Sequence, residues 1–360
     1  MPVRSSVLAA GALAVAVLAA AAAASPAAAA ATRPGGPFAL TCSVHVLPVA
    51  ITDSGPADQS MWGELCYRGA AEPSTVQLLV PGASYTDQYW NFPYGNGYYS
   101  YVDAATAAGY ATFDVDRIGD GNSSHPPSAE VTIAAGAVAL HDAVTALRSG
   151  AVGGHPFAKV IMVGHSLGSF ETWAEDAAYH DVDAVIITGA LHQLAPAAGP
   201  RAAADLYPAV DDPKFASSGL DPGYLTSMPG TRESLFYDPA TASPALVATD
   251  EATKATITVP ELDGLIATLA EPAAQQPSSQ VNVPVLLVDG AEDNVFCVGV
   301  TAYNCTSPAS VRAYESQFYA AAPRLTVVTI PQTGHDLALS TTAPLTDVAM
   351  LAWSAVTVAP

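Results

Sequence analysis

A five-residue motif, Gly164-His165-Ser166-Leu167-Gly168, constrains the fold of this chain more than any other feature. It follows the apolar run 160–163 and precedes a stretch, 169–179, that has the pattern of a helix. A sharp turn between a buried strand and a helix strains its serine, and side chains two positions away on either side would collide with neighbouring elements. Glycines at those positions therefore predict that the Ser166 hydroxyl is raised above a sheet edge, as a serine nucleophile requires. The alternative is an ordinary glycine-rich turn with an exposed serine.

Strands and helices alternate along most of the chain. Apolar runs predict strands at 44–51, 62–67, 75–80, 110–115, 159–163, 184–188, 283–288 and 325–330. Helical patterns occur at 98–108, 128–147, 169–179, 310–320 and 345–356. This alternation predicts an α/β fold with a mostly parallel sheet and helices on both faces. The continuous apolar character of the strands agrees with burial on both sides.

One interval, residues 192–280, interrupts the alternation. It is rich in Pro, Ala, Asp and Tyr and shows no clear strand. A segment of this length inside a compact domain needs structure of its own. We expect a largely helical cap insertion over the carboxyl edge of the sheet, which divides the core into residues 32–191 and 281–360.

The first 31 residues have the pattern of a secretory signal peptide. Arg4 supplies positive charge, residues 7–24 form an apolar run, and residues 27–31 offer small side chains for cleavage. The pattern predicts a secreted, extracellular protein. A membrane anchor is the alternative, but the run is dominated by alanine and breaks at Ser25-Pro26.

The cysteines agree with an extracellular location. An even, small number in a secreted chain suggests two disulfides. Sequence proximity favours Cys42 with Cys66 and Cys297 with Cys305, and an unpaired thiol pair is the alternative. Because no C-x-x-C spacing occurs, we expect no zinc site. The acidic residues Asp114, Asp116 and Asp120 do not have the spacing of a calcium-binding loop, so we expect no other metal, and we expect no cofactor.

The chain is strongly acidic. Its formal net charge is −21, while hydrophobic residues make up 50% and charged residues 12%. This is a globular composition, and its charge repels nucleic acid and anionic membranes. We therefore expect a neutral or cationic small-molecule substrate, no nucleic-acid partner and no stable membrane insertion after signal removal.

A serine nucleophile needs a base and an acid. Among eight histidines, His335 stands out because it follows the last predicted strand, where a loop can bring an imidazole to Ser166. Three carboxylates follow the strand before it. We favour Asp293 over Asp289 and Glu292, because it lies beyond the turn at Gly290 and keeps the chain order serine, acid, histidine.

Two backbone N–H groups are candidates for an oxyanion site. The N–H of Leu167 directly follows the candidate nucleophile. The turn after the strand at 75–80 offers the second donor, for which we favour Ala83, because Gly82 allows close approach of the backbone.

Five motifs together resemble the α/β-hydrolase-fold serine hydrolases, in particular secreted bacterial esterase-like or lipase-like members. They are L-L-V-P-G at 78–82, D-R-I-G-D-G-N-S at 116–123, G-H-S-L-G at 164–168, V-D-G-A-E-D at 288–293 and G-H-D at 334–336. The resemblance implies the α/β-hydrolase fold and a Ser-His-Asp triad. Pro81-Gly82 stands where many relatives carry His-Gly.

Aromatic residues crowd the segment after the candidate oxyanion turn. Tyr85, Tyr89 and Trp90 are candidates for an acyl-binding or aryl-binding wall, with His192 at the rim. The alternative is packing between this segment and the cap.

Together these features predict a secreted hydrolase that cleaves a neutral, largely apolar carboxylic ester through an acyl-enzyme. A lactonase, or an amidase or peptidase, could use the same three residues. A non-catalytic binding protein on the same fold is the alternative from another class.

Overall fold

The computed structural model describes residues 39–69 and 71–360. The predicted signal peptide at 1–31 lies outside these described residues. The described part of the chain contains every residue that the sequence predicts to take part in catalysis.

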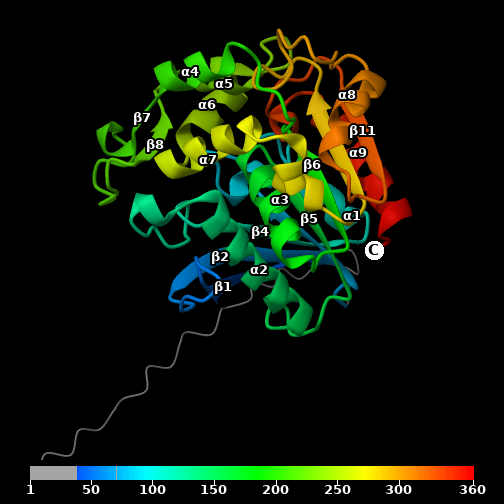
Figure 1. Cartoon of the computed structure of the whole chain (residues 1–360). Coiled ribbons are helices and arrows are strands. Elements are labelled where there is room, and N and C mark those ends of the chain that lie inside the picture. The colour runs from blue at the N-terminus through cyan, green and yellow to red at the C-terminus, as the bar shows by residue number, and fades with distance from the viewer. Residues whose placement is uncertain (1–38, 70) are drawn as a thin grey trace, which may run out of the picture.

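An eight-stranded sheet runs through the centre of the molecule in the order β1-β2-β4-β3-β5-β6-β10-β11 (Figure 1). Its strands are β1 (Leu40–Val49), β2 (Gln59–Arg68), β3 (Thr75–Val80), β4 (Ala111–Val115), β5 (Lys159–His165), β6 (Ala184–Thr188), β10 (Val285–Gly290) and β11 (Leu325–Ile330). The β1–β2 and β2–β4 pairs are antiparallel, and the remaining pairs are parallel. The prediction of a mostly parallel sheet is confirmed.

Helices cover both faces of the sheet (Figure 1). They are α1 (Tyr101–Ala107), α2 (Ile133–Ser149), α3 (Leu167–Tyr179), α8 (Pro308–Glu315) and α9 (Ala343–Thr357). Alternate residues of β5 point to opposite faces. Val160 and Met162 join the core beneath α2 and α3, whereas Ile161 and Val163 join the core beneath α1 and α9. The wholly apolar run before the serine motif therefore reflects burial on both sides.

Two helices begin later than their sequence patterns suggested. The predicted helix 128–147 is a single 3₁₀ turn followed by α2, which begins after Thr132, whose hydroxyl accepts a hydrogen bond from Ala135 N–H. Similarly, α1 begins after Ser100, which caps Asp103 N–H. In both places a side-chain oxygen satisfies a free N–H of the first turn and sets the start. The 3₁₀ turns are η1 (Asp87–Tyr89), η2 (Ser128–Glu130), η3 (Ala209–Asp211), η4 (Ala273–Gln275), η5 (Pro277–Gln280), η6 (Ser316–Phe318) and η7 (Leu337–Leu339).

Residues 192–280, the predicted cap, lie between β6 and β10, and their helices α4 to α7 lie toward the top of Figure 1; this segment is called the cap below. Its helices are α4 (Ala198–Asp205), α5 (Arg232–Phe236), α6 (Pro244–Thr253) and α7 (Val259–Ala270). The cap also holds a small antiparallel sheet that the sequence did not reveal, with strands β7 (Leu206–Pro208), β8 (Tyr224–Ser227) and β9 (Ile257–Thr258). Strands this short are too brief to show an alternating pattern.

The cap contacts the loops that follow the carboxyl ends of the core strands. Ser84, after β3, donates its N–H to Thr256 O at 2.8 Å. Asp336, after β11, donates its N–H to Phe236 O at 3.1 Å. The cap therefore covers the edge of the sheet where the loops with the candidate catalytic residues meet.

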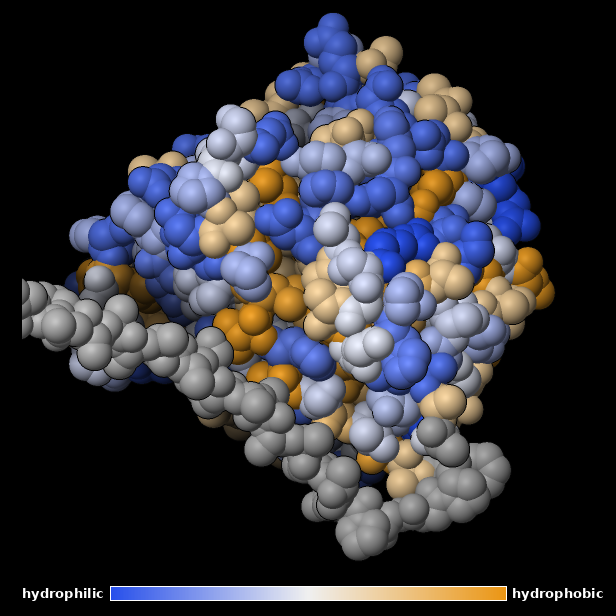
Figure 2. All heavy atoms as spheres, turned by 90° about the horizontal axis from the view of Figure 1, so that it is seen from below, coloured by the Kyte–Doolittle hydropathy of each residue, from blue (hydrophilic) through white to orange (hydrophobic). Residues whose placement is uncertain are grey.

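Both predicted disulfides are present. Cys42–Cys66 joins β1 to β2 at directly paired positions, and Cys297–Cys305 closes a loop after β10. Within residues 39–69 and 71–360, no helix combines the length and apolarity needed to cross a bilayer. On the face drawn in Figure 2, hydrophobic residues form separate small groups among hydrophilic ones.

We expect the two disulfides to stabilise the fold unequally. A disulfide stabilises mainly by restricting the unfolded chain, more so for longer loops. The pairs are separated by 24 and 8 residues. Replacing Cys42 and Cys66 by alanine should thus lower the free energy of unfolding by about 3–4 kcal/mol, and replacing Cys297 and Cys305 by about 2–3 kcal/mol. Urea unfolding of the two double variants, each the control for the other, measures this, and a reversed order would contradict the loop-length argument.

Candidate active site

Ser166 occupies a strained turn between β5 and α3. Its backbone has φ 50° and ψ −118°, which side-chain-bearing residues rarely adopt. A Cβ at Gly164 would lie 2.6 Å from Gly168 O, and a Cβ at Gly168 would lie 2.5 Å from Pro81 O. Both glycines are therefore required by close contacts with backbone atoms.

Three of the predicted site residues form a continuous hydrogen-bonded chain. Ser166 Oγ lies 2.9 Å from His335 Nε2, and His335 Nδ1 lies 2.9 Å from Asp293 Oδ2. Because a carboxylate only accepts, Nδ1 carries the ring proton and Nε2 is free to accept the serine proton. The three side chains come from loops after β5, β11 and β10, whose carboxyl ends lie at one edge of the sheet.

Asp293 is buried and firmly held. Its Oδ1 accepts the N–H groups of Val295 at 2.6 Å and Phe296 at 3.1 Å. Burial would raise the pKa of Asp293, but the charge and hydrogen bond of His335 outweigh it, so the pKa is lowered. The N–H of Cys297 donates to Asp293 O, which ties this turn to the loop closed by the second disulfide.

Neither of the two competing carboxylates is the one hydrogen-bonded to His335, although Asp289 neighbours Asp293. Asp289 is buried at the end of β10, where its Oδ1 accepts Gly290 N–H at 2.7 Å. Glu292 is exposed and lines an outer cavity. The carboxylate hydrogen-bonded to His335 is that of Asp293.

The imidazole of His335 is more basic than a free histidine. Burial lowers its pKa, whereas the charge of Asp293, its hydrogen bond and the charge of Asp336 raise it, and the net shift is upward. A base whose pKa lies somewhat above its ordinary value accepts a proton more readily.

The loop with Ala83 lies directly against the Ser166 turn. A Cβ at Gly82 would be 2.9 Å from His165 Cδ2 and 3.1 Å from Ser166 Cβ. Ala83, Ser166 and His335 line one cavity. Leu167 is the first residue of α3, so its N–H has no acceptor within the helix. The two candidate oxyanion residues therefore reach Ser166 from different elements, Ala83 from the loop after β3 and Leu167 from the start of α3.

The cap braces the loop of Ala83. Besides the bond from Ser84 N–H to Thr256 O, Ala255 N–H donates to Ser84 O at 2.8 Å. The buried guanidinium of Arg232 donates to Ser84 Oγ at 3.0 Å. Arg232 is in turn held by Asp250 Oδ2 at 2.7 Å. No sequence pattern indicated this brace, because an isolated arginine in a cap resembles a surface residue.

A second buried network lies behind His335. The Thr188 hydroxyl donates to Gly164 O at 3.0 Å, so it accepts the Nδ1–H of His165 at 3.1 Å. His165 Nε2 then presents a lone pair 3.4 Å from Asp336 Oδ1. Burial foremost, and the charge of Asp250, raise the pKa of Asp336 to about 7. Tyr85 OH donates to the other oxygen of Asp336, which completes the network.

The three aromatic residues that were candidates for a substrate wall lie behind the cavity of Ser166. Tyr85, Tyr89 and Trp90 are buried and are not among the residues that line the cavity of Ser166. Tyr89 stacks on His165 with ring centroids 4.1 Å apart, and Trp90 meets Tyr89 edge-on. All three rings belong to the core behind the site, where the face of Tyr89 covers the buried His165 ring.

His192 is also not at the cavity. It is buried between Trp173 and Phe318, whose ring centroids lie 4.6 and 4.0 Å from its own. Its Nδ1 lies 2.5 Å from Glu315 Oε2 and its Nε2 lies 2.8 Å from Ser278 Oγ. Ser278, His192 and Glu315 thus form a second Ser-His-acid set. A substrate cannot reach it as it can reach Ser166, since Ser278 is 0% exposed, whereas Ser166 is 9% exposed and lines a cavity.

The cavity at Ser166 is apolar and largely supplied by the cap. Its volume is about 230 Å³. Its apolar lining comprises Leu194, Leu206, Leu235, Phe236, Ile257, Leu262, Leu265, Ile266 and Val295. An outer cavity of about 490 Å³ shares Arg201 and Asn294 with it and is lined by Glu233, Asp238 and Glu292.

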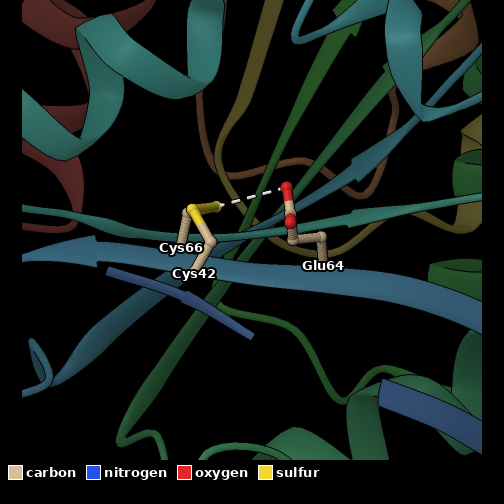
Figure 3. A group of neighbouring side chains, drawn as sticks. All are labelled: Cys42, Glu64 and Cys66. Atoms are coloured by element: carbon tan, nitrogen blue, oxygen red, sulfur yellow. Dashed lines mark hydrogen bonds between the residues drawn. A yellow bond between two sulfur atoms is a disulfide. The ribbon is translucent and has the colours of Figure 1, made fainter. Parts of the chain in front are cut away.

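One cluster of metal-ligand residue types lies on β1 and β2. Figure 3 shows the Glu64 carboxylate directed at Cys66, whose sulfur is bonded to that of Cys42. Glu64 Oε2 lies 3.6 Å from Cys66 Sγ. Because both sulfurs are oxidised to a disulfide, neither is the thiolate that a metal requires.

The alpha/beta hydrolase family model matches residues 77–350. The chain belongs to the alpha/beta hydrolase family. The predicted fold is thereby confirmed, and the protein is a hydrolase for which a small-molecule substrate is the natural expectation. A comparison with curated protein sequences finds no match.

Solved structures of this fold resemble the hydrolase at low sequence identity. A thermophilic esterase from Thermogutta terrifontis has 17% identity and a TM-score of 0.54, covering 86% of this chain and 97% of the other. A putative aryl esterase from Burkholderia cenocepacia has 15% identity and a TM-score of 0.57, covering 88% and 100%. A bromoperoxidase from Bacillus anthracis has 19% identity and a TM-score of 0.52, covering 86% and 99%. These likenesses concern the fold, which hosts several chemistries.

We expect Gly168→Ala to disrupt the turn. The added methyl group would meet Pro81 O and Val80 O at 2.5 and 2.6 Å, and backbone atoms cannot move aside cheaply. Overpacking of this kind should lower the free energy of unfolding by about 1–3 kcal/mol. Gly264→Ala in α7 is the matched control, because its methyl group comes only within 3.4 Å of Ile133 and alanine favours helix. Thermal unfolding measures both, and equal effects would contradict the steric argument.

Proposed function

We propose that this hydrolase cleaves a neutral, largely apolar carboxylic ester through an acyl-enzyme formed on Ser166. The observation that carries the proposal is the chain of hydrogen bonds from Ser166 Oγ through His335 to Asp293, opening onto an apolar cavity. A nucleophile, a base and an orienting acid within hydrogen-bond reach are the parts that acyl transfer needs.

Each group has a defined task in this mechanism. As Ser166 Oγ bonds to the carbonyl carbon, His335 Nε2 takes its proton and the carbonyl electron pair moves to oxygen. The N–H groups of Leu167 and Ala83 stabilise that oxyanion. Collapse expels the alcohol, which receives the proton from His335, and water then repeats the sequence to release the acid. Asp293 holds the imidazole in the required tautomer and stabilises it when charged.

The cavity favours a short apolar group. Its volume of about 230 Å³ lies below the range of about 300–1,000 Å³ typical of ligand pockets. Arg201 lines both cavities, but three carboxylates line the outer one, and with the net charge of −21 they disfavour an anionic substrate. These features support a neutral ester with a short acyl chain over a long-chain or phosphorylated substrate.

We also propose that the protein is secreted. The signal-peptide pattern of residues 1–31 and the two disulfides support this, because such bonds persist in oxidising compartments.

A panel of p-nitrophenyl esters from acetyl to palmitoyl, with lactones and anilides, tests the substrate class. We expect the highest kcat/KM for short acyl esters, because longer chains exceed the cavity. Turnover of only an anilide or only a lactone would replace the ester assignment. Failure of every substrate, together with resistance of the folded protein to a serine-reactive phosphonate, would favour a binding protein.

We expect Ser166→Ala to lower kcat by about 10⁴-fold or more, because the nucleophile is lost. Ser278→Ala is the matched control, since its hydroxyl also lies 2.8 Å from a histidine nitrogen but is fully buried. It should retain hydrolysis and phosphonate labelling. Loss of labelling in Ser278→Ala with retention in Ser166→Ala would assign the nucleophile to the other serine.

Activity should fall as pH decreases through the raised pKa of His335. The base must be neutral to accept the serine proton, so the acid limb of kcat/KM is expected above pH 6.5, the ordinary histidine value. Asp293→Asn removes the charge that raises this pKa, so it should move the limb to lower pH and reduce kcat by about 10⁴-fold. An acid limb that stays in place in Asp293→Asn would show that another group controls it.

A further inference from the structure

A cluster of possible metal ligands lies between α2 and α3. His141 is on α2, Glu175 is near the end of α3, and Asp181 follows that helix. One ligand atom from each lies within 4.8 Å of the others. His141 Nδ1 is 2.7 Å from Asp181 Oδ2 and 4.0 Å from Glu175 Oε1. None of the three lines the Ser166 cavity, which adjoins the opposite end of α3.

Glu175 is the unusual member of this cluster. Its side chain is 0% exposed, yet neither carboxylate oxygen has a hydrogen-bond partner among the described residues. A buried carboxylate without partners is costly, so such a group binds a cation or a proton. Asp181 is the neighbouring carboxylate, and a proton on either group would allow a hydrogen bond between the two.

The surroundings add negative charge, and within residues 39–69 and 71–360 no lysine or arginine pairs with Glu175 or Asp181. The ion pairs of these two carboxylates are with His141. The neighbouring Asp176 adds a third carboxylate, whose Oδ2 accepts Asn282 N–H at 3.3 Å. Arg148 donates to the backbone carbonyl of Asp181 at 2.9 Å, but its side-chain ion pair is with Asp183 at 2.5 Å. A divalent cation would offset the repulsion between these carboxylates.

Although the sequence predicted no metal site, we propose that His141, Glu175 and Asp181 bind a divalent transition metal of the zinc type. One imidazole nitrogen with two carboxylates is a donor set that suits Zn²⁺, whereas Ca²⁺ takes six to eight oxygen ligands. The His141 ring stacks on Tyr179 with centroids 3.8 Å apart, which limits its rotation. His141 and Asp181 are partly exposed, so the ion can enter and water can complete its coordination.

The metal would have a structural role. It would join α2 to the end of α3, the helix that begins immediately after Ser166. Its binding should stabilise the fold without contributing a group to the Ser166 cavity. The competing explanation is a proton on Glu175 that is shared with Asp181 and leaves no place for an ion.

Titration of tag-free, EDTA-treated protein with ZnCl₂ by calorimetry tests the proposal. We expect one Zn²⁺ per chain and a Tm raised by a few degrees at saturating metal, because ligand binding to the folded state stabilises it. CaCl₂ should bind at least tenfold more weakly. Zinc content of the dialysed protein by mass spectrometry gives the stoichiometry independently.

Two variants assign the ligands, and one serves as control. Glu175→Gln and His141→Ala should each weaken Zn²⁺ binding at least tenfold and abolish the metal-dependent rise in Tm. Glu175→Gln should remain folded without metal, because it removes a buried carboxylate. His155→Ala removes a histidine that is 83% exposed and outside the cluster, so it should bind Zn²⁺ like the parent protein.

The proposal fails if the parent protein binds no Zn²⁺ at micromolar concentrations, or if Glu175→Gln and His141→Ala both retain parental binding. The first outcome would support the shared proton. Because binding and Tm are measured without substrate, neither outcome depends on whether Ser166 acts as a nucleophile.

Discussion

The backbone of one residue, Ser166, governs how the parts of this hydrolase meet. Its positive φ is tolerated because β5, α3 and the loop after β3 pack closely against the turn. The same contacts that strain the serine bring Gly82 within van der Waals distance of it. The nucleophile and the loop of Ala83 are therefore positioned by a single steric constraint, and strain stored at such a turn is kept by the packing around it.

Buried ion pairs attach the cap to this core. Arg117, after β4, contacts Glu171 of α3 at 3.0 Å, Glu261 of α7 at 2.6 Å and Asp120 at 2.5 Å. Arg232 in the cap performs a similar task near Ser84. Buried pairs add little net stability compared with apolar packing, but removing one partner leaves an uncompensated charge. These pairs therefore fix where the cap sits over the apolar cavity more than they stabilise the fold.

The sequence was informative wherever a local pattern had a local cause. Apolar runs gave the bounds of the strands at 75–80, 184–188 and 325–330 directly, including the half-buried edge strand β11. Helix starts were less accurate, because the caps at Ser100 and Thr132 are single side chains within otherwise helical patterns. The small sheet of the cap was missed, since strands of two to four residues carry no periodicity.

The aromatic residues after β3 show most clearly what the sequence could not predict. Several tyrosines and a tryptophan follow β3. Their composition is compatible with the wall of a substrate pocket and equally with a hydrophobic core. The stacking of Tyr89 on the ring face of the buried His165, which only the structure shows, places these side chains in the core. His192 is similar, because its partners Ser278 and Glu315 lie 86 and 123 residues away along the chain.

The sequence by itself determined the fold family, the strained serine turn and the chain order of serine, acid and histidine, because each depends on residues within a short segment. The tertiary structure decided which groups lie side by side: the carboxylate that reaches His335, the arginine that braces Ser84 and the side chains that line the cavity. The physical reason is that strand order and cap placement bring together residues far apart in sequence. Once buried, the polar side chains among these residues must form hydrogen bonds or ion pairs with one another, since an unpaired polar group inside a protein is costly.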